Sequence, residues 1–297
     1  MPSKFNIALT YALLVFIWAT TPLAIVWSAT DLHPLWALAL RFFLAFPIAI
    51  LLLLILRGRL PLDQRSIQSY IAGASSFIGS QIFTYLAVDY LSSGLIALMF
   101  GLAPLITGIL GVFIFKIRLY WSQWLGMVIA LIGLAIISLG GDQQVVHPTG
   151  IVLMLMSVLI YCASIFWIKK INAPLQPLSQ ATGSITISTL IALCLLPFIW
   201  QYAPIQIPEM KSLLGLFYAV VMSSLLAMFC YFKLVKNIKA TTLSLTTVLT
   251  PIIALGVGAY FNNEALTTMI FVGAFVLLTG LFVYFYKDLM LAYKVKK

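Results

Sequence analysis

The sequence predicts an all-α polytopic membrane protein of ten transmembrane helices, arranged as two inverted repeats of five. Three observations lead to this fold class: an extreme composition, ten apolar runs of membrane-spanning length, and an internal repeat at a fixed offset. Hydrophobic residues make up 63% of the 297 residues and charged residues only 8%, which leaves too little polar surface to cover a water-soluble globule. A lipid bilayer is therefore the solvent of this chain.

The spans follow from apolar runs between charges and turn residues, because an α-helix needs about 20 mostly apolar residues to cross the hydrocarbon core. Ten runs qualify, and none alternates as barrel strands do. The loops between them are too short for a soluble domain. In order, the expected spans are 7–29, 35–56, 69–88, 94–115, 121–139, 150–168, 178–200, 212–232, 241–261 and 267–286.

The first run raises the alternative of a signal peptide, since Lys4 precedes it and Trp27 to Ala29 resembles a cleavage site. Its apolar stretch is longer than the hydrophobic core of a signal peptide. We therefore expect it to remain as a span.

The charges predict the topology. Of the 17 basic residues, Arg41 lies within a span and Lys211 lies on the side that carries Asp31, Asp89, Glu209 and Glu264. The positive-inside rule places the more basic side in the cytoplasm, and with it both termini. All the other basic residues fall on that cytoplasmic side: Lys4, Arg57, Arg59, Arg65, Lys116, Arg118, Lys169, Lys170, Lys233, Lys236, Lys239, Lys287, Lys294, Lys296 and Lys297.

An internal repeat appears when the chain is compared with itself at an offset of 147 residues. Pro104 then aligns with Pro251 without a gap, and three glycines match in the same register: Gly111 with Gly258, Gly126 with Gly273, and Gly133 with Gly280. Near an offset of 143, Arg41 lies over Ser184 and Trp18 over Tyr161. A proline and three glycines in one register indicate two related halves.

Each half holds five spans, an odd number, so the second half must cross the membrane in the opposite sense. Inverted repeats of this kind recur in secondary transporters, whose binding sites lie at the repeat interface near the bilayer midplane. The sequence therefore predicts a carrier with a central site.

Pro104 and Pro251 fall in the middle of predicted spans, where proline removes a hydrogen bond. They are expected to free the carbonyls of Phe100 and Thr247, and such groups are tolerated at membrane depth only where protein or a wet cavity satisfies them. We expect the two prolines to act as kinks beside a cavity; ordinary helix packing is the alternative.

Small and hydroxyl side chains form a stripe at helical spacing on the third span and another on the eighth. Such stripes let helices pack closely, but Gln81 and Tyr231 are bulkier than packing requires and are candidates to face a solute. The candidate cavity-lining residues are Trp18, Ser76, Ser80, Gln81, Thr84, Phe100, Tyr161, Ser224, Tyr231 and Thr247.

Arg41 is the one strong charge inside a span. An intramembrane charge is costly and usually functional, although an arginine near a helix end can reach the interface. Binding an anionic group of a solute therefore competes with pairing to Asp89 or to helix carbonyls.

Other functional classes find little support. The three cysteines are widely separated and both histidines lie in loops, so no metal site, cofactor or catalytic cluster is expected. The basic charge marks topology rather than nucleic-acid binding.

A receptor or assembly component would not need inverted halves. Every acidic residue lies in a loop or at a span end, which favours gradient-driven transport over a buried proton relay, with Asp89 and Glu264 as the exceptions to consider.

Several motifs resemble the EamA family of the drug/metabolite transporter superfamily. They are LAVDYLSSGLIALMFGLAPLITGILGVFIF, the following WSQWLGMVIALIGLAII, the arginine of ALRF, and in the second half TTLSLTTVLTPIIALGVGAYFNNE with GAFVLLTG. The resemblance covers essentially the whole chain. It implies one repeat over residues 5–140, a second over 149–287, and a basic cytoplasmic tail over 288–297. Glu264 matches a family glutamate after the ninth span, whereas Lys116, Ile117 and Arg118 depart from that pattern after the fourth.

The resemblance also implies a ten-span carrier of the cell inner membrane, usually an exporter of amino acids or related metabolites, and it favours a structural role for Arg41. We expect export of neutral, hydrophobic or aromatic amino acids by alternating access. Nucleobase-like or drug-like solutes, or facilitated import, are the alternatives. The expected partners are a small solute and the lipid bilayer, with the protein as a monomer.

Overall fold

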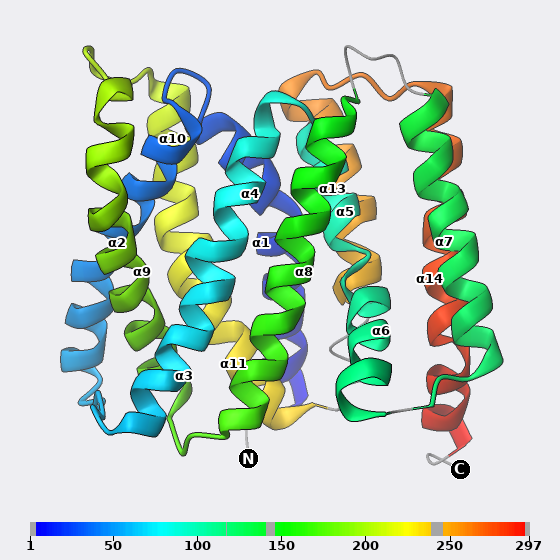
Figure 1. Ribbon diagram of the computed structural model, residues 1–297, viewed down its shortest axis with the longest axis horizontal. Coiled ribbons are helices and arrows are strands. Elements are labelled where there is room, and N and C mark those ends of the chain that lie inside the picture. Colours follow the sequence, from blue (N-terminus) through cyan, green and yellow to red (C-terminus); the bar gives the residue numbers. More distant parts are fainter. Residues whose placement is uncertain (1–3, 117, 141–145, 239–245, 295–297) are drawn as a thin grey trace.

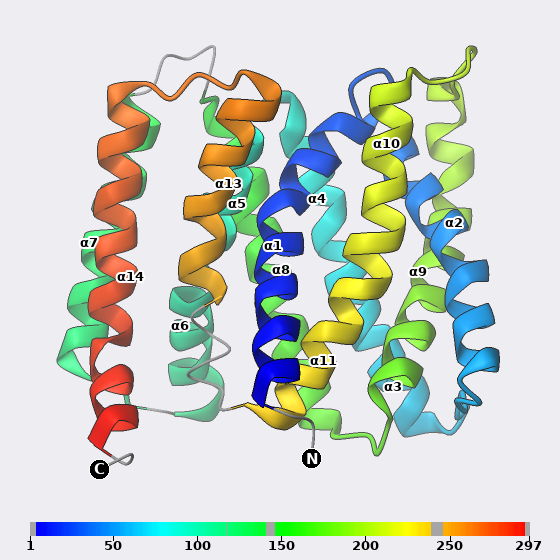
Figure 2. The same ribbon diagram turned by 180° about the vertical axis from the view of Figure 1, so that it is seen from behind.

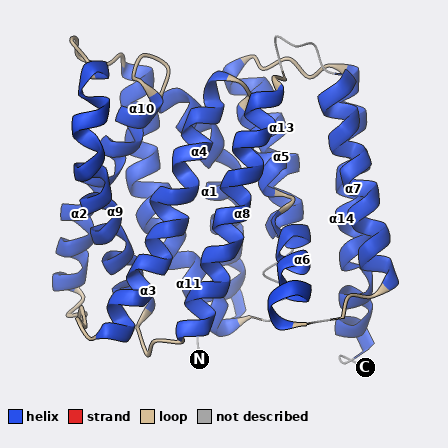
Figure 3. Ribbon diagram, in the orientation of Figure 1, coloured by secondary structure: helices blue, strands red, loops and turns tan. Residues whose placement is uncertain are grey.

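The computed structural model describes residues 4–116, 118–140, 146–238 and 246–294, and these form a helical protein (Figure 3). Within these ranges the only strand-like pairing is an isolated bridge between Leu91 and Val146. The chain is thus an all-α polytopic membrane protein. The helices are α1 (Lys4–Ser28), α2 (Pro34–Ile55), α3 (Gln64–Ala74), α4 (Gln81–Leu86), α5 (Ser93–Phe100), α6 (Ala103–Phe115), α7 (Trp121–Gly140), α8 (Pro148–Ile171), α9 (Pro177–Ile199), α10 (Met210–Tyr218), α11 (Ala227–Asn237), α13 (Thr246–Asn262) and α14 (Thr268–Lys294).

Nine segments of the described chain are long and apolar enough to cross a membrane, and Leu249–Asn262 is a shorter apolar helix. The shorter helix belongs to the ninth predicted span, whose first residues, 241–245, lie outside the described ranges. Large apolar side chains on the outer surface, such as Phe113, Trp121 and Phe198, are 76–81% exposed. This exposure suits a surface that contacts lipid.

Both described chain ends, the start of α1 and the end of α14, lie on one face of the helix bundle, called here the terminus face (Figures 1 and 2). The loop between α2 and α3 lies on the same face. The opposite face carries the loop between α1 and α2. Helix α14 continues to Lys294, so most of the segment that the sequence assigned to a tail (288–297) is helical.

Local sequence fixes where helices begin. Proline occupies the first turn of α2, α8 and α9, where a missing N–H is tolerated. His33 caps α2, with Nδ1 accepting from the backbone N–H of Leu35 at 3.3 Å. Partial burial lowers the pKa of His33 and outweighs the nearby charge of Asp89, which raises it. The lowered pKa favours the neutral ring, and only a neutral ring can accept this hydrogen bond.

The third span of each half contains a π-helical turn. One covers Ser75–Ser80 between α3 and α4, and the other covers Ala219–Leu226 between α10 and α11. π-Helical turns are rare and are often found at functional sites. In such a turn some carbonyl groups lose the hydrogen bond that the backbone N–H four residues later would donate in an α-helix. The hydroxyl of Ser224 compensates at one of them, because its Oγ donates to the carbonyl of Ala219 at 2.9 Å.

The structure interrupts the fourth span just before Pro104, so the proline expected to kink one helix instead lies at the start of a second one. The fourth span is two helices, α5 and α6, separated at Gly101 and Leu102, and Pro104 lies in the first turn of α6. At that position the missing N–H breaks no helical bond. Pro251 does lie inside a helix, α13, and its Cγ would be 3.3 Å from a Cβ built at Gly101. The proline of one half therefore packs against the break of the other.

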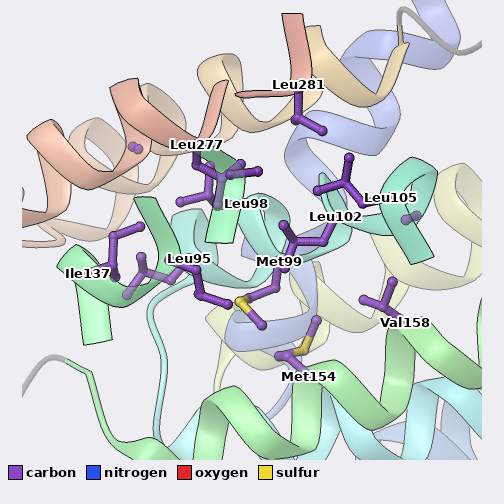
Figure 4. Packing of buried hydrophobic residues seen from close by; sticks show 14 of the residues in the cluster. Leu95, Leu98, Met99, Leu102, Leu105, Ile137, Met154, Val158, Leu277 and Leu281 are labelled. Carbon is purple, nitrogen blue, oxygen red and sulfur yellow. The ribbon is translucent and has the colours of Figure 1, made fainter. Parts of the chain in front are cut away.

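A buried apolar cluster surrounds this break. Leu95, Leu98, Met99, Leu102 and Leu105 of the broken span meet residues of α7, α8 and α14, including Met154, Val158, Leu277 and Leu281 (Figure 4). The cluster fixes α5 and α6 in place, since burial of each such side chain contributes about 1.5–3 kcal/mol.

Helices α7 and α14 lie side by side at one edge of the protein (Figures 1 and 2) and meet through the repeat-matched glycines. A Cβ at Gly126 would lie 2.6 Å from the carbonyl oxygen of Gly280, and one at Gly133 would lie 2.7 Å from that of Gly273. The 147-residue repeat aligns Gly126 with Gly273 and Gly133 with Gly280, so each of these two contacts is the repeat equivalent of the other. Because real Cβ atoms do not approach backbone so closely, only glycine fits at these positions.

We expect Gly133→Ala and Gly280→Ala to destabilise the protein, because the added methyl group forces α7 and α14 apart. Overpacking of a well-packed contact typically costs about 1–3 kcal/mol. The matched control is Gly256→Ala, since nothing lies within 4 Å of a Cβ at Gly256 and alanine favours helix. Thermal unfolding in detergent should give a lower midpoint for the first two variants only; unchanged midpoints would contradict close backbone packing.

Candidate functional site

A central cavity of about 350 Å³ lies between the two halves of the chain. Its wall comes from α1, α2, the third span, the α5–α6 break, α8, α9, the π-helical turn Ala219–Leu226 with α11, and α13. The described residues of the wall include none from α7 or α14. Such a volume is at the lower end of the range for small-molecule sites.

The cavity extends toward the terminus face. Ile165, Ile168 and Lys169 line it near the end of α8, and Lys169 is exposed. Gln180, close to the start of α9, also contributes. In the other direction the lining ends at Ile25 and Ile96, which are 2% and 0% exposed. The cavity is thus closed toward the face opposite the termini.

Seven residues singled out from the sequence lie in the wall: Trp18, Arg41, Ser76, Gln81, Phe100, Tyr161 and Tyr231. Their rings form two pairs. The Trp18 and Tyr231 centroids are 5.5 Å apart, and Phe100 meets Tyr161 edge to face at 6.0 Å. The cavity therefore offers aromatic surfaces from both halves.

Three other candidates do not line the cavity. Ser80 and Thr84 are fully buried and share Ser157, whose Oγ lies 2.9 Å from Ser80 Oγ and 2.7 Å from Thr84 Oγ1. These hydroxyl groups join the third span to α8, so they serve helix packing. Ser224 is fully buried and accepts a hydrogen bond from Arg41 Nε. The side chain of Thr247 lies outside the described part of the chain.

Arg41 is 5% exposed and is held by uncharged partners. Its Nε donates to Ser224 Oγ at 2.9 Å and its Nη1 to Gln81 Oε1 at 3.3 Å. Among the described residues no carboxylate oxygen lies within 4.0 Å of the guanidinium, so the pairing with Asp89 weighed from the sequence is not formed.

Sequence reasoning missed the polar residues on the terminus side of the cavity. Gln180 Nε2 donates to the backbone oxygen of Ser69 at 2.9 Å and to Ser184 Oγ at 3.0 Å, while Ser69 Oγ donates to Gln180 Oε1 at 2.6 Å. Gly73 makes room for Ser184, because a Cβ there would clash with its Oγ. In the sequence, Ser184 appeared only as the repeat counterpart of Arg41. That relation was the one sequence feature that could have placed Ser184 at the cavity.

Side chains from both halves close the opposite face. Glu264 accepts from the backbone N–H groups of Ser93 at 2.9 Å and Gly94 at 3.1 Å, at the start of α5. Asn262 Nδ2 donates to the same carboxylate at 3.1 Å, and its Oδ1 accepts from Trp27 Nε1 at 3.0 Å. A carboxylate at a helix N-terminus is favoured by the helix dipole as well as by these bonds. These contacts, called here the Glu264 latch, join α13 and α14 to α1 and α5.

The residues beside the two prolines, rather than the prolines, reach the cavity. Phe100 and Ala103 line it at the α5–α6 break and Thr250 lines it from α13. Within the described part of the chain no three His, Cys, Asp or Glu residues are grouped as metal ligands would be.

The chain resembles known proteins along most of its length. The model of the EamA-like transporter family matches residues 6–139 and 148–286. PagO of Salmonella typhimurium is 26% identical over 94% of this chain and 92% of that protein. A probable amino-acid metabolite efflux pump of Escherichia coli is 25% identical over 91% and 92%, and the uncharacterized inner membrane transporter YedA of the same species is 23% identical over 86% and 82%.

The fold has a counterpart among solved structures. One crystal structure superposes with a TM-score of 0.67 over 99% of this chain and 100% of that one, at 16% identity. Since the family model matches both halves and nearly all of the chain, this protein belongs to the EamA-like transporter family.

Proposed function

We propose that the protein is a secondary transporter of the inner membrane that exports neutral, hydrophobic or aromatic amino acids. The central cavity carries this proposal, because it lies between the halves, is lined by aromatic and hydroxyl side chains, and is closed toward one face. The name of the Escherichia coli relative, an amino-acid metabolite efflux pump, supports the solute class and the direction.

Inverted repeats over residues 5–140 and 149–287 supply the mechanism of alternating access. Two features support this relation. The glycine contacts between α7 and α14 are exchanged by the repeat offset, as expected for a pseudo-two-fold axis. The third span of each half has a π-helical turn beside the cavity. Exchanging the conformations of the halves would close the terminus side and open the other.

The basic loops place the terminus face in the cytoplasm. In the described conformation the cavity would then be open to the cytoplasm, where a solute for export enters. Lys169 lies at this entrance. Breaking the Glu264 latch would be part of opening toward the other side.

Transport is tested by counterflow into liposomes that contain the purified protein and an excess of unlabelled amino acid. Saturable uptake of labelled phenylalanine or leucine is expected without an ion gradient. Trp18→Ala and Tyr231→Ala should lower the rate at least roughly tenfold, because each removes an aromatic surface of the cavity.

The matched control for these variants is Trp167→Ala, whose ring lies 45% exposed on the outside of α8. It should transport at the wild-type rate. Equal rates for all three variants would contradict the assignment of the cavity, and an absence of counterflow for every amino acid would contradict the proposed solute class.

The latch is tested by Glu264→Ala, which removes the acceptor for Ser93 and Gly94. The variant should populate the state open to the opposite face, so a cysteine introduced at Ile25 should react several-fold faster with an impermeant thiol reagent added from outside. Cys162, Cys194 and Cys230 are replaced beforehand. Glu209→Ala is the control, because the Glu209 side chain forms no hydrogen bond within the described residues. Equal reactivity in the two variants would rule out a gating role for Glu264.

A further inference from the structure

The cavity contains a buried positive charge that no described carboxylate neutralises. Arg41 is 95% buried, and an arginine side chain stays protonated at any physiological pH. Both of its described acceptors, Ser224 and Gln81, are neutral. Burying a charge without an opposite charge costs several kcal/mol, so such a group in a membrane protein calls for a further partner.

The guanidinium also has unused hydrogen-bonding capacity. It carries five N–H donors, and its described hydrogen bonds use two. The bonds to Ser224 and Gln81 fix the direction of the group, while Arg41 lies in the wall of the cavity. A planar, oriented guanidinium with free N–H groups matches a carboxylate, which can accept two parallel hydrogen bonds.

The described wall has no carboxylate that could pair with a cation. Its described charged members are Arg41 and Lys169, and the described residues of the wall include no aspartate or glutamate. The acidic residues Asp31, Glu209 and Glu264 lie in loops at the opposite face, where the Asp31 carboxylate accepts from the backbone N–H of Glu209 and the Glu264 carboxylate from that of Ser93. The field in the cavity is therefore positive, which attracts anions and opposes an unpaired ammonium group.

The aromatic pairs indicate the rest of the solute. Trp18 with Tyr231 and Phe100 with Tyr161 provide flat apolar surfaces in the same wall as Arg41. Aromatic and hydrophobic groups gain most from such surfaces.

We propose that Arg41 binds the carboxylate of the solute, and that the site selects aromatic or hydrophobic monocarboxylates without requiring an α-amino group. This inference rests on the proposed transport function and changes its solute class. An amino acid is accepted as a carboxylic acid, and its ammonium group contributes no attraction. An amine that lacks the carboxylate is rejected.

The wild-type protein gives the first test. Binding of 3-phenylpropionate, phenylalanine and phenethylamine to the full-length protein in detergent is measured at pH 7 by calorimetry. The three probes share a phenyl ring and differ in their charged groups. We expect 3-phenylpropionate to bind at least as tightly as phenylalanine, and phenethylamine roughly tenfold or more weakly. Tighter binding of phenethylamine than of 3-phenylpropionate would overturn the proposal.

Variants of Arg41 give the second test. Arg41→Met should weaken binding of 3-phenylpropionate roughly 10- to 100-fold, the usual effect of losing a charge-assisted pair. Arg41→Lys should be intermediate, because it keeps the charge and loses the two-pronged geometry. The control, Arg65→Met, removes an exposed arginine outside the cavity and should bind as the wild type does.

Thermal unfolding without ligand separates this role from a structural one. Because Arg41 has no opposite charge among the described residues, Arg41→Met should unfold at or above the wild-type temperature. Loss of stability with unchanged binding of 3-phenylpropionate would assign Arg41 to structure and overturn the proposal. Should Arg41→Met not fold, the lysine variant and the wild-type probe series decide.

Counterflow with the same probes distinguishes this inference from the proposed function. Transport of phenylalanine but not of 3-phenylpropionate would support an amino-acid carrier and overturn the inference. Binding of 3-phenylpropionate through Arg41 without transport of any probe would support the inference and contradict the carrier function.

Discussion

The constraint on which this structure depends is that backbone polar groups within a bilayer must find partners inside the protein. Regular helix satisfies it everywhere on the lipid-facing surface. The departures, namely the break at Gly101 and Leu102 and the two π-helical turns, are all turned toward the protein interior. Buried hydroxyls repair part of the loss, as Ser224 does for Ala219. The irregular backbone and the cavity therefore occur in the same place for the same reason.

The same constraint gives the spans of each half two different structural roles. The last span of each half, α7 or α14, is unbroken and packs through glycines on its repeat counterpart. The other spans surround the cavity and include every irregular segment. A tight, regular pair beside a group of interrupted helices gives the protein a fixed edge against which the remaining spans can rearrange.

Periodicity and composition predicted the unbroken helices within three residues at each end, because a hydrophobic run of fixed length is the dominant signal in a bilayer. The exceptions are α14, which continues eight residues beyond its predicted span, and α13, whose predicted start lies outside the described residues. The repeat register even located the glycines that pair α7 with α14. It failed where two local conformations are compatible with the same residues. Pro104 suits both a kink and a helix start, and only the packing of Gly101 against Pro251 decides between them. Ser80 and Thr84 fit a cavity stripe as well as a helix contact, and their partner Ser157 lies on a span distant in sequence.

The Glu264 latch has one further consequence. At the repeat-equivalent position after the fourth span the chain has Ile117, which cannot accept hydrogen bonds from a helix N-terminus. If the halves exchange conformations as proposed, the terminus face would form no equivalent of this latch, and the conformation open to the terminus face would be favoured at rest. Solute arriving on that face would then meet protein that is ready to bind, whereas solute on the other face would first have to release the latch. Half-saturation should therefore occur at a lower concentration from the terminus face, while net flux still follows the gradient.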